Sequence, residues 1–245
     1  MRRPALPAVI TGFCNEFCKD LQMIVLYGSY ATQTQTENSD VDLLIVDNSY
    51  QQGCRIQRVI DGYPIQAAVM NARELVVTLQ EATKKSNPFW PGVLQQPLVL
   101  FDKAGLSQHL APLAAEKLQQ GAGMLAPAQL ELMRIGIVNF MNDGTSEKYL
   151  GTTRSETVVW AAKLLTMLED YLLACIGGWL KNNARFKKAE LLARLPHARL
   201  ALHQQLDIFL TDFNAERYVQ GLKAQLQDLI QFDWDTQAPH HAAIL

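Results

Sequence analysis

The first half of the chain alternates short apolar runs with polar turns, a pattern typical of strands joined by loops. The runs at residues 23–28 (MIVLYG) and 41–46 (VDLLIV) have the length and composition of buried strands. Residues 54–60 and 63–70 are separated by Asp61-Gly62, a favoured two-residue turn. This second pair of runs therefore predicts a β-hairpin.

Helical patterns surround these strands. Residues 5–21 have the periodicity of an amphipathic helix, and Asn71 stands where it can cap the helix that follows the hairpin. Residues 97–102 (PLVLFD) predict a last strand, and residues 106–119 predict a helix after it.

The second half of the chain, from Pro127 onward, has almost no strand signal. Helices are predicted at residues 127–142, 149–176, 185–194, 198–213 and 215–231. The change of character falls at Gly121-Ala-Gly123. We therefore predict an α+β protein with two domains, a mixed α/β domain at residues 1–121 and an all-helical bundle at residues 122–245.

Composition narrows the classes of function. The chain has 245 residues, a net charge of −2 and a pI of about 6.2, which argues against an extended nucleic-acid-binding surface. No apolar window reaches the length of a membrane span. Cys14, Cys18, Cys54 and Cys175 have no disulfide or zinc-ribbon spacing, which favours free thiols in a reducing compartment. We expect a cytoplasmic protein that does not bind membranes.

Two aspartates at the start of a predicted strand are the first candidate for chemistry. Side chains alternate along a strand, so Asp40 and Asp42 lie on one face while Val41, Leu43 and Ile45 point into the core. Two neighbouring carboxylates repel unless a cation joins them. Mg²⁺ prefers oxygen ligands and often uses one or two carboxylates plus substrate phosphates. The competing interpretation is a solvated strand edge whose aspartates pair with lysine.

A Gly-Ser pair just before this strand adds to the pattern. Gly28 and Ser29 close the preceding strand, and residues 30–36 can start a helix there. A turn of this kind offers backbone N–H groups and a hydroxyl to a phosphate, and glycine allows close approach to the backbone.

The combination of G-S-Y-A with S-D-V-D-L-L-I-V resembles the signature of the nucleotidyltransferase superfamily, the DNA polymerase β-like fold. Gly28 and Ser29 match its phosphate-holding pair, and Asp40 and Asp42 match its two metal-binding carboxylates. The layout of a small mixed-sheet domain before a helical bundle is similar to the two-domain kanamycin-type aminoglycoside nucleotidyltransferases.

The resemblance implies transfer of a nucleoside monophosphate from an NTP such as ATP to a hydroxyl, with Mg²⁺ or Mn²⁺ and with pyrophosphate leaving. Two metal ions about 3.5–4 Å apart would clamp the reacting phosphate. The chain is not basic enough for tRNA, so we expect a small-molecule or protein acceptor.

The sequence departs from the family pattern at the third carboxylate. That acid is expected on the return strand of the hairpin, where the matching position is Gln66. Glutamine offers a neutral carbonyl oxygen but cannot take a proton. The A-R-G that often follows Gly-Ser is replaced by Ala31-Thr32-Gln33. Either another residue is the base, or catalysis is impaired.

The helical half supplies candidates for the missing base. Glu156, Lys163 and Asp170 are seven residues apart and share one stripe of a predicted helix. Because the second domain supplies a base in the kanamycin-type enzymes, we predict Glu156 as the base and Lys163 as a phosphate contact. A solvated helix face is the alternative.

Three functional hypotheses follow. The first is an active nucleotidyltransferase. The second is a catalytically impaired protein of the same fold, acting as a nucleotide-binding or antitoxin-like regulatory module, which Gln66 favours. The third is a structural interaction protein in which the two aspartates are incidental. Apolar helices in the second domain allow two copies to pair, so we include a homodimer among the expectations.

Overall fold

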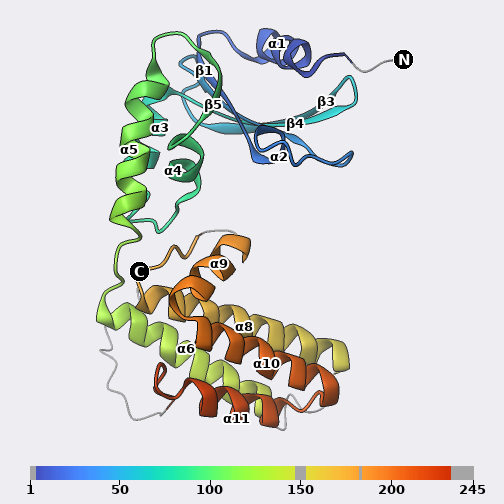
Figure 1. The fold of residues 1–245 in the computed structure, drawn as a ribbon, viewed down its shortest axis with the longest axis vertical. Coiled ribbons are helices and arrows are strands. Elements are labelled where there is room, and N and C mark those ends of the chain that lie inside the picture. Colours follow the sequence, from blue (N-terminus) through green and yellow to red (C-terminus); the bar gives the residue numbers. More distant parts are fainter. Residues whose placement is uncertain (1–3, 147–152, 182–183, 233–245) are drawn as a thin grey trace. The chain divides into compact units, whose positions relative to one another are not determined.

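The computed structural model describes residues 4–146, 153–181 and 184–232 (Figure 1). The chain divides into two compact units, Met1–Gly121 and Ala122–Leu245. Each unit has its own hydrophobic core, and each is described separately below.

The N-terminal unit contains one five-stranded mixed sheet. Its elements, in chain order, are α1 (Leu6–Phe17), β1 (Leu21–Tyr27), α2 (Gly28–Ala31), β2 (Val41–Asp47), β3 (Cys54–Ile60), β4 (Tyr63–Met70), α3 (Ala72–Gln80), α4 (Phe89–Leu94), β5 (Leu98–Asp102) and α5 (Leu106–Gln120). The strand order is β3-β4-β2-β1-β5. β2 and β4 run parallel, and the other neighbouring strands are antiparallel. The predicted fold class, a mixed-sheet domain before an all-helical region, is confirmed.

Both faces of the sheet are covered by helices. α1 packs on one face, where Val41, Leu43 and Ile45 are buried (Figure 1). α3, α4 and α5 cover much of the other face, where Leu44 and Val46 are buried. The sequence pattern predicted only the first of these cores. Burial on both faces explains why the β2 run is almost continuously apolar rather than alternating.

Local signals in the hairpin and in the helix after it behave as predicted. Asp61 and Gly62 have φ values of 50° and 80°, the two left-handed positions of a tight hairpin turn. The side chain of Asn71 accepts a hydrogen bond from the Glu74 N–H at 2.8 Å and caps α3.

The helix after β1 is shorter than predicted and begins earlier in the chain than residues 30–36. α2 is a single turn, Gly28–Ala31. The Thr32 hydroxyl donates to the carbonyl oxygens of Gly28 and Ser29. These side-chain hydrogen bonds compete with the backbone hydrogen bonds that would continue the helix. Gln33 then adopts a positive φ of 57°, which ends the helical path.

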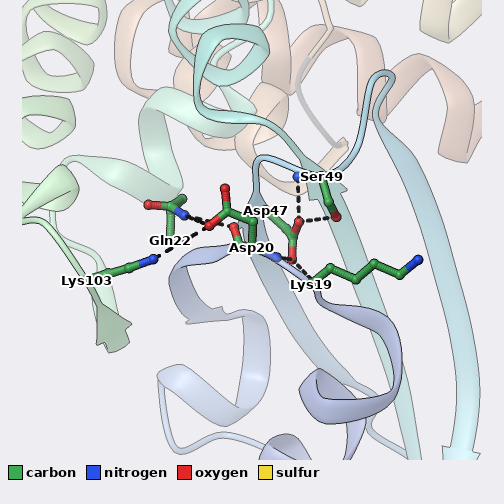
Figure 2. A network of polar contacts seen from close by, with 6 residues as sticks. All are labelled: Lys19, Asp20, Gln22, Asp47, Ser49 and Lys103. Carbon is green, nitrogen blue, oxygen red and sulfur yellow. Dashed lines mark hydrogen bonds and ion pairs between the residues drawn. The ribbon is translucent and has the colours of Figure 1, made fainter.

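Asp47 is the last residue of β2, at the opposite end of the strand from Asp42. Its side chain is 0 % exposed and accepts backbone N–H groups of Lys19 at 2.9 Å, Asp20 at 3.1 Å and Ser49 at 2.8 Å. Figure 2 shows this network, which extends through Asp20 to Lys103. Burial raises the pKa of Asp47, but the hydrogen bonds from Ser49, Asp20 and Lys19 outweigh it and hold the pKa below its usual value.

The second unit consists of packed helices. Its elements are α6 (Pro127–Thr145), α8 (Arg154–Cys175), α9 (Ala184–Arg194), α10 (Pro196–Asp212) and α11 (Ala215–Leu226). The helix predicted at residues 149–176 appears as α8, and residues 149–152 lie outside the described residues. Within the described ranges, no helix has both the length and the apolar character that a membrane crossing needs.

A close approach between α6 and α8 organises the core of this unit. Trp160 is buried, and its indole N–H donates to the Phe140 carbonyl at 3.1 Å. A Cβ at Gly144 would lie 1.9 Å from the Trp160 ring, so only glycine fits there. Trp160 and Phe209 both pack against the buried Tyr218 ring. These contacts fix the first turns of α8, which carry Glu156.

Candidate functional site

The two aspartates lie at the N-terminal end of β2, in the centre of the sheet. Asp40 directly precedes the strand, and Asp42 lies within it; both are partly buried. Asp42 is paired with Tyr27 of β1 on one side and with Gln66 of β4 on the other. Asp42 therefore belongs to the face of the sheet that also carries Leu44, beyond the region that the helices of that face bury.

Gln66 lies beside both aspartates. It stands in parallel register with Asp42, and its amide nitrogen donates to a carboxylate oxygen of Asp40 at 2.8 Å. Rotation of this amide by half a turn would present its carbonyl oxygen instead. The hairpin thus brings a neutral amide to the corner where the family pattern has a third acid.

The Asp42 carboxylate occupies the space that a side chain on Gly28 would need. A Cβ on Gly28 would come 2.2 Å from Asp42 Oδ2, and the residue has a φ of +70°, which favours glycine. Gly28 and Asp42 are 14 residues apart in the sequence, yet the antiparallel pairing of β1 with β2 brings them into contact. The turn after β1 and the aspartate pair therefore form one site.

The turn that contains Ser29 is fixed by its own backbone. The Thr34 N–H donates to the Ser29 carbonyl at 2.9 Å, and the Thr32 N–H donates to the Gly28 carbonyl at 3.2 Å. These bonds close a short loop whose first residues adjoin Asp42.

Electrostatics in this site disfavour a second negative charge. Burial and the neighbouring Asp40 raise the pKa of Asp42 to about 6, and Arg55 opposes the rise. A carboxylate with this pKa is partly protonated just below neutral pH. A bound cation would favour its ionised form and release the proton.

The donor set fits a hard divalent cation such as Mg²⁺. Two carboxylates on one face, with an amide that can turn its carbonyl oxygen inward, are oxygen ligands of the type that Mg²⁺ uses together with substrate phosphates. Within the ranges that the structure describes, no cluster of three or more His, Cys, Asp or Glu side chains is placed to hold a metal. The carboxylate count at this site is therefore two.

The sequence reasoning missed two residues on the same face. Arg55 lowers the pKa of Asp42 against the effect of burial, and burial together with Asp42 raises the pKa of the Tyr27 hydroxyl to about 12. The signal was available for Arg55, because alternation along β3 puts it on the side of Gln57, which pairs with Gln66.

An aromatic group borders this part of the sheet. The Tyr27 ring makes edge contacts with Phe89 and Trp90 of α4, each at 5.7 Å between ring centroids. Phe89 is 44 % exposed, so an apolar surface adjoins the polar site.

Glu156 and Lys163 lie on α8 of the helical unit. The Glu156 carboxylate accepts from the Thr153 N–H at 2.7 Å and from the Thr153 hydroxyl at 2.9 Å, which forms a capping box. The backbone and side-chain hydrogen bonds from Thr153 lower the pKa of Glu156. The Lys163 ammonium lies 5.0 Å from the centroid of the Phe140 ring. The spacing Thr153-x-x-Glu156 is the sequence signature of this cap.

Comparisons with known proteins agree with this geometry. Residues 10–90 match the family model described as "Polymerase beta, Nucleotidyltransferase". A nucleotidyltransferase-like protein from Exiguobacterium sibiricum 255-15, a crystal structure at 1.90 Å resolution, superposes with a TM-score of 0.50 at 12 % sequence identity. The match covers 91 % of this chain and 75 % of that one, and at this identity it supports the fold alone. No curated protein matches the sequence.

The matched segment runs from α1 through the hairpin into the start of α4, and it contains Gly28, Asp40, Asp42 and Gln66. The family match, the mixed sheet and the meeting of Gly28 with Asp42 agree with one another. Residues 10–90 of the N-terminal unit are thus similar in sequence to the nucleotidyltransferase family, and the fold of the unit agrees with that similarity.

Proposed function

We propose that this protein transfers a nucleoside monophosphate from an NTP to a hydroxyl group of a small molecule or a protein, with Mg²⁺ or Mn²⁺ as the cofactor. The observation that carries the proposal is the contact between Gly28 and the Asp42 carboxylate, with Asp40 and Gln66 alongside. A glycine beside a metal-binding carboxylate leaves the backbone accessible, which a site needs when a phosphate must approach that backbone. A solvated strand edge has no such requirement.

In this proposal the chain's own residues position the donor. Asp40 and Asp42 bind the cation that accompanies the triphosphate, and Gly28 and Ser29 hold the β- and γ-phosphates. The bound cation would neutralise charge on the phosphate that is transferred. The acceptor oxygen forms a bond to the α-phosphorus while the bond from that phosphorus to the bridging oxygen breaks. Pyrophosphate carries away the electron pair, and the acceptor proton passes to a base.

Glu156 remains the residue that we propose as this base. It lines a cavity of about 620 Å³ in the helical unit, together with Arg154 and Trp160, and such a cavity can hold an acceptor. Because Glu156 also caps α8 through Thr153, a substitution that tests its role as a base must keep these hydrogen bonds. Glu156→Gln keeps an oxygen that can accept from Thr153 and removes the basic carboxylate. We expect a fall in the transfer rate of at least about 100-fold with little change in melting temperature.

The proposal is tested with the full chain, Mg²⁺ and each of the four α-³²P-labelled ribonucleoside triphosphates. Candidate acceptors are the protein itself, a cell-extract protein fraction and a panel of small polyhydroxyl compounds that includes aminoglycosides. We expect label on an acceptor together with an equal amount of pyrophosphate, and loss of both in Asp42→Asn. Nucleotide binding with no transfer to any acceptor would point to the second candidate below. Absence of nucleotide binding would contradict both.

The second candidate is a nucleotide-binding regulatory module with impaired catalysis. The specific observation behind it is the hydrogen bond from the Gln66 amide to Asp40, where an acid would have added a third negative charge. Gln66→Glu separates the two candidates. If it creates transfer in a silent wild-type protein, Gln66 is the position of the missing carboxylate, and the natural chain is a binding module.

A further inference from the structure

The segment that forms the proposed phosphate site carries no positive charge of its own. No lysine, arginine or histidine occurs between Lys19 and Arg55, a stretch that includes Gly28, Ser29 and both aspartates. A nucleoside triphosphate with one Mg²⁺ still has excess negative charge. Two carboxylates add to that excess, so a cation from another part of the sheet is needed for tight binding.

The sheet supplies one cation on the correct face. Gln57 pairs with Gln66, and Arg55, two residues earlier on β3, pairs with Ala68 of β4. Ala68 in turn pairs with Leu44 of β2. Alternation along each strand places Arg55 on the face of Asp42. Its backbone is two strands from β2, about 10 Å away.

The charge of Arg55 influences this site. Ala68, which lies between Arg55 and Leu44 in the sheet, has a small side chain, and the positive charge of Arg55 lowers the pKa of both Asp42 and Tyr27 against the effect of burial. Tyr27 pairs with Asp42 from β1, which neighbours β2 on the side away from β4.

The other arginine of the same strand shows the contrast. Arg58 is three residues later and on the opposite face, where its guanidinium lies 5.7 Å from the centroid of the Phe17 ring of α1. It also donates to the Gln57 carbonyl at 2.9 Å. Both arginines are exposed and belong to β3, so Arg58 is a matched control for charge and for strand stability.

We propose that Arg55 is a phosphate-binding residue of the nucleotide site, on the face of the sheet that carries Asp42 and Tyr27. This inference rests on the proposed function and extends it. The guanidinium group donates to oxygen atoms of the bound triphosphate beside Asp42, and it supplies the positive charge that the Gly28-Ser29 turn lacks. Arginine suits this task because its planar group can donate two parallel hydrogen bonds to a phosphate.

Two titrations of opposite expected sign test the assignment. The first measures binding of the non-transferable analogues α,β-methylene-ATP and α,β-methylene-GTP with Mg²⁺ by calorimetry. Arg55→Gln should weaken binding by about 10- to 100-fold, the range expected for lost hydrogen bonds to a charged group. Arg55→Lys should lie between Arg55→Gln and the wild type, and Arg58→Gln should bind like the wild type.

The second titration measures Mn²⁺ alone, without nucleotide, by electron paramagnetic resonance. A cation beside Asp42 repels the metal, so Arg55→Gln should bind Mn²⁺ as tightly as the wild type or about threefold more tightly. Loss of nucleotide affinity with unchanged or improved Mn²⁺ affinity is a result that mere loss of structure cannot give.

Each other result contradicts a defined part of the inference. Equal nucleotide affinity in Arg55→Gln and the wild type would overturn the assignment of Arg55 and leave the proposed function standing. Parallel loss of nucleotide, Mn²⁺ and thermal stability would show that Arg55 is structural. If the wild type binds neither analogue, the proposed function falls and the role of Arg55 falls with it.

Discussion

Replacement of Asp42 by asparagine should stabilise the protein at neutral pH. The pKa of Asp42 is raised from 3.8 to about 6 by burial and by Asp40. Above pH 6 the carboxylate is ionised in both the folded and the unfolded chain, and the folded state bears the cost. A pKa difference of about two corresponds to about 3 kcal/mol. Because Asp42 is only partly buried, solvent screening reduces this, and we expect a gain of about 1–2 kcal/mol from Asp42→Asn at pH 7.5.

The pH dependence gives this prediction its sign. As the pH falls through 6, Asp42 becomes protonated in the folded protein first, and its cost disappears as the pH approaches 4. The advantage of Asp42→Asn should therefore be full at pH 7.5 and fall to about a third of that value at pH 4.5. Urea unfolding measures the gain, and hydrogen exchange of the β1 and β2 amides identifies the transition of the N-terminal unit.

Asp47 provides the matched control on the same strand. Its pKa is held below the usual value by hydrogen bonds, so its ionised form stabilises the fold at neutral pH, and this stabilisation is lost in acid. Asp47→Asn should therefore destabilise the N-terminal unit at pH 7.5. If Asp42→Asn destabilises the protein as Asp47→Asn does, Asp42 is a structural residue and the electrostatic argument for a cation site is wrong.

Three further predictions concern single positions. Gly28→Ala should weaken Mn²⁺ binding at least tenfold because its Cβ would displace the Asp42 carboxylate. Gly105→Ala, at a similar φ of +66° but in ordinary contact with its surroundings, should lower stability only. Equal Mn²⁺ affinities in the two variants would refute the contact argument. Gln66→Glu should lower stability in the absence of metal, because a third carboxylate adds repulsion, and should raise the Mn²⁺ affinity measured by calorimetry, because it adds a ligand. An unchanged Mn²⁺ affinity would place the metal elsewhere. Thr153→Ala should destabilise the helical unit by about 1 kcal/mol through loss of the α8 cap, and circular dichroism melts that match the wild type would refute that role.

Much of the N-terminal unit was predictable because its signals are local. Asp61-Gly62 defined the hairpin, and Asn71 defined the start of α3. The short polar spacing between Gly28 and the aspartates identified the site, since it leaves room only for a turn and a return strand. Counting along the hairpin also located Gln66 opposite Asp42.

The features that could not be predicted depend on strand order. The contact of Gly28 with Asp42 follows from the antiparallel pairing of β1 and β2. The position of Arg55 relative to Asp42 depends on β4 lying between β3 and β2. A sequence pattern gives the face of each strand but not its neighbours. The cap formed by Glu156 is different, because the Thr-x-x-Glu spacing that produces it is local in the sequence.

The most direct test of the central claim is a crystal of the full chain grown with Mn²⁺ and a non-transferable nucleotide such as α,β-methylene-ATP. Anomalous scattering would locate the metal. We predict manganese bound to the carboxylates of Asp40 and Asp42, with the β- and γ-phosphates against Gly28 and Ser29. A nucleotide bound elsewhere, or phosphates at this site with no metal on either aspartate, would contradict the account.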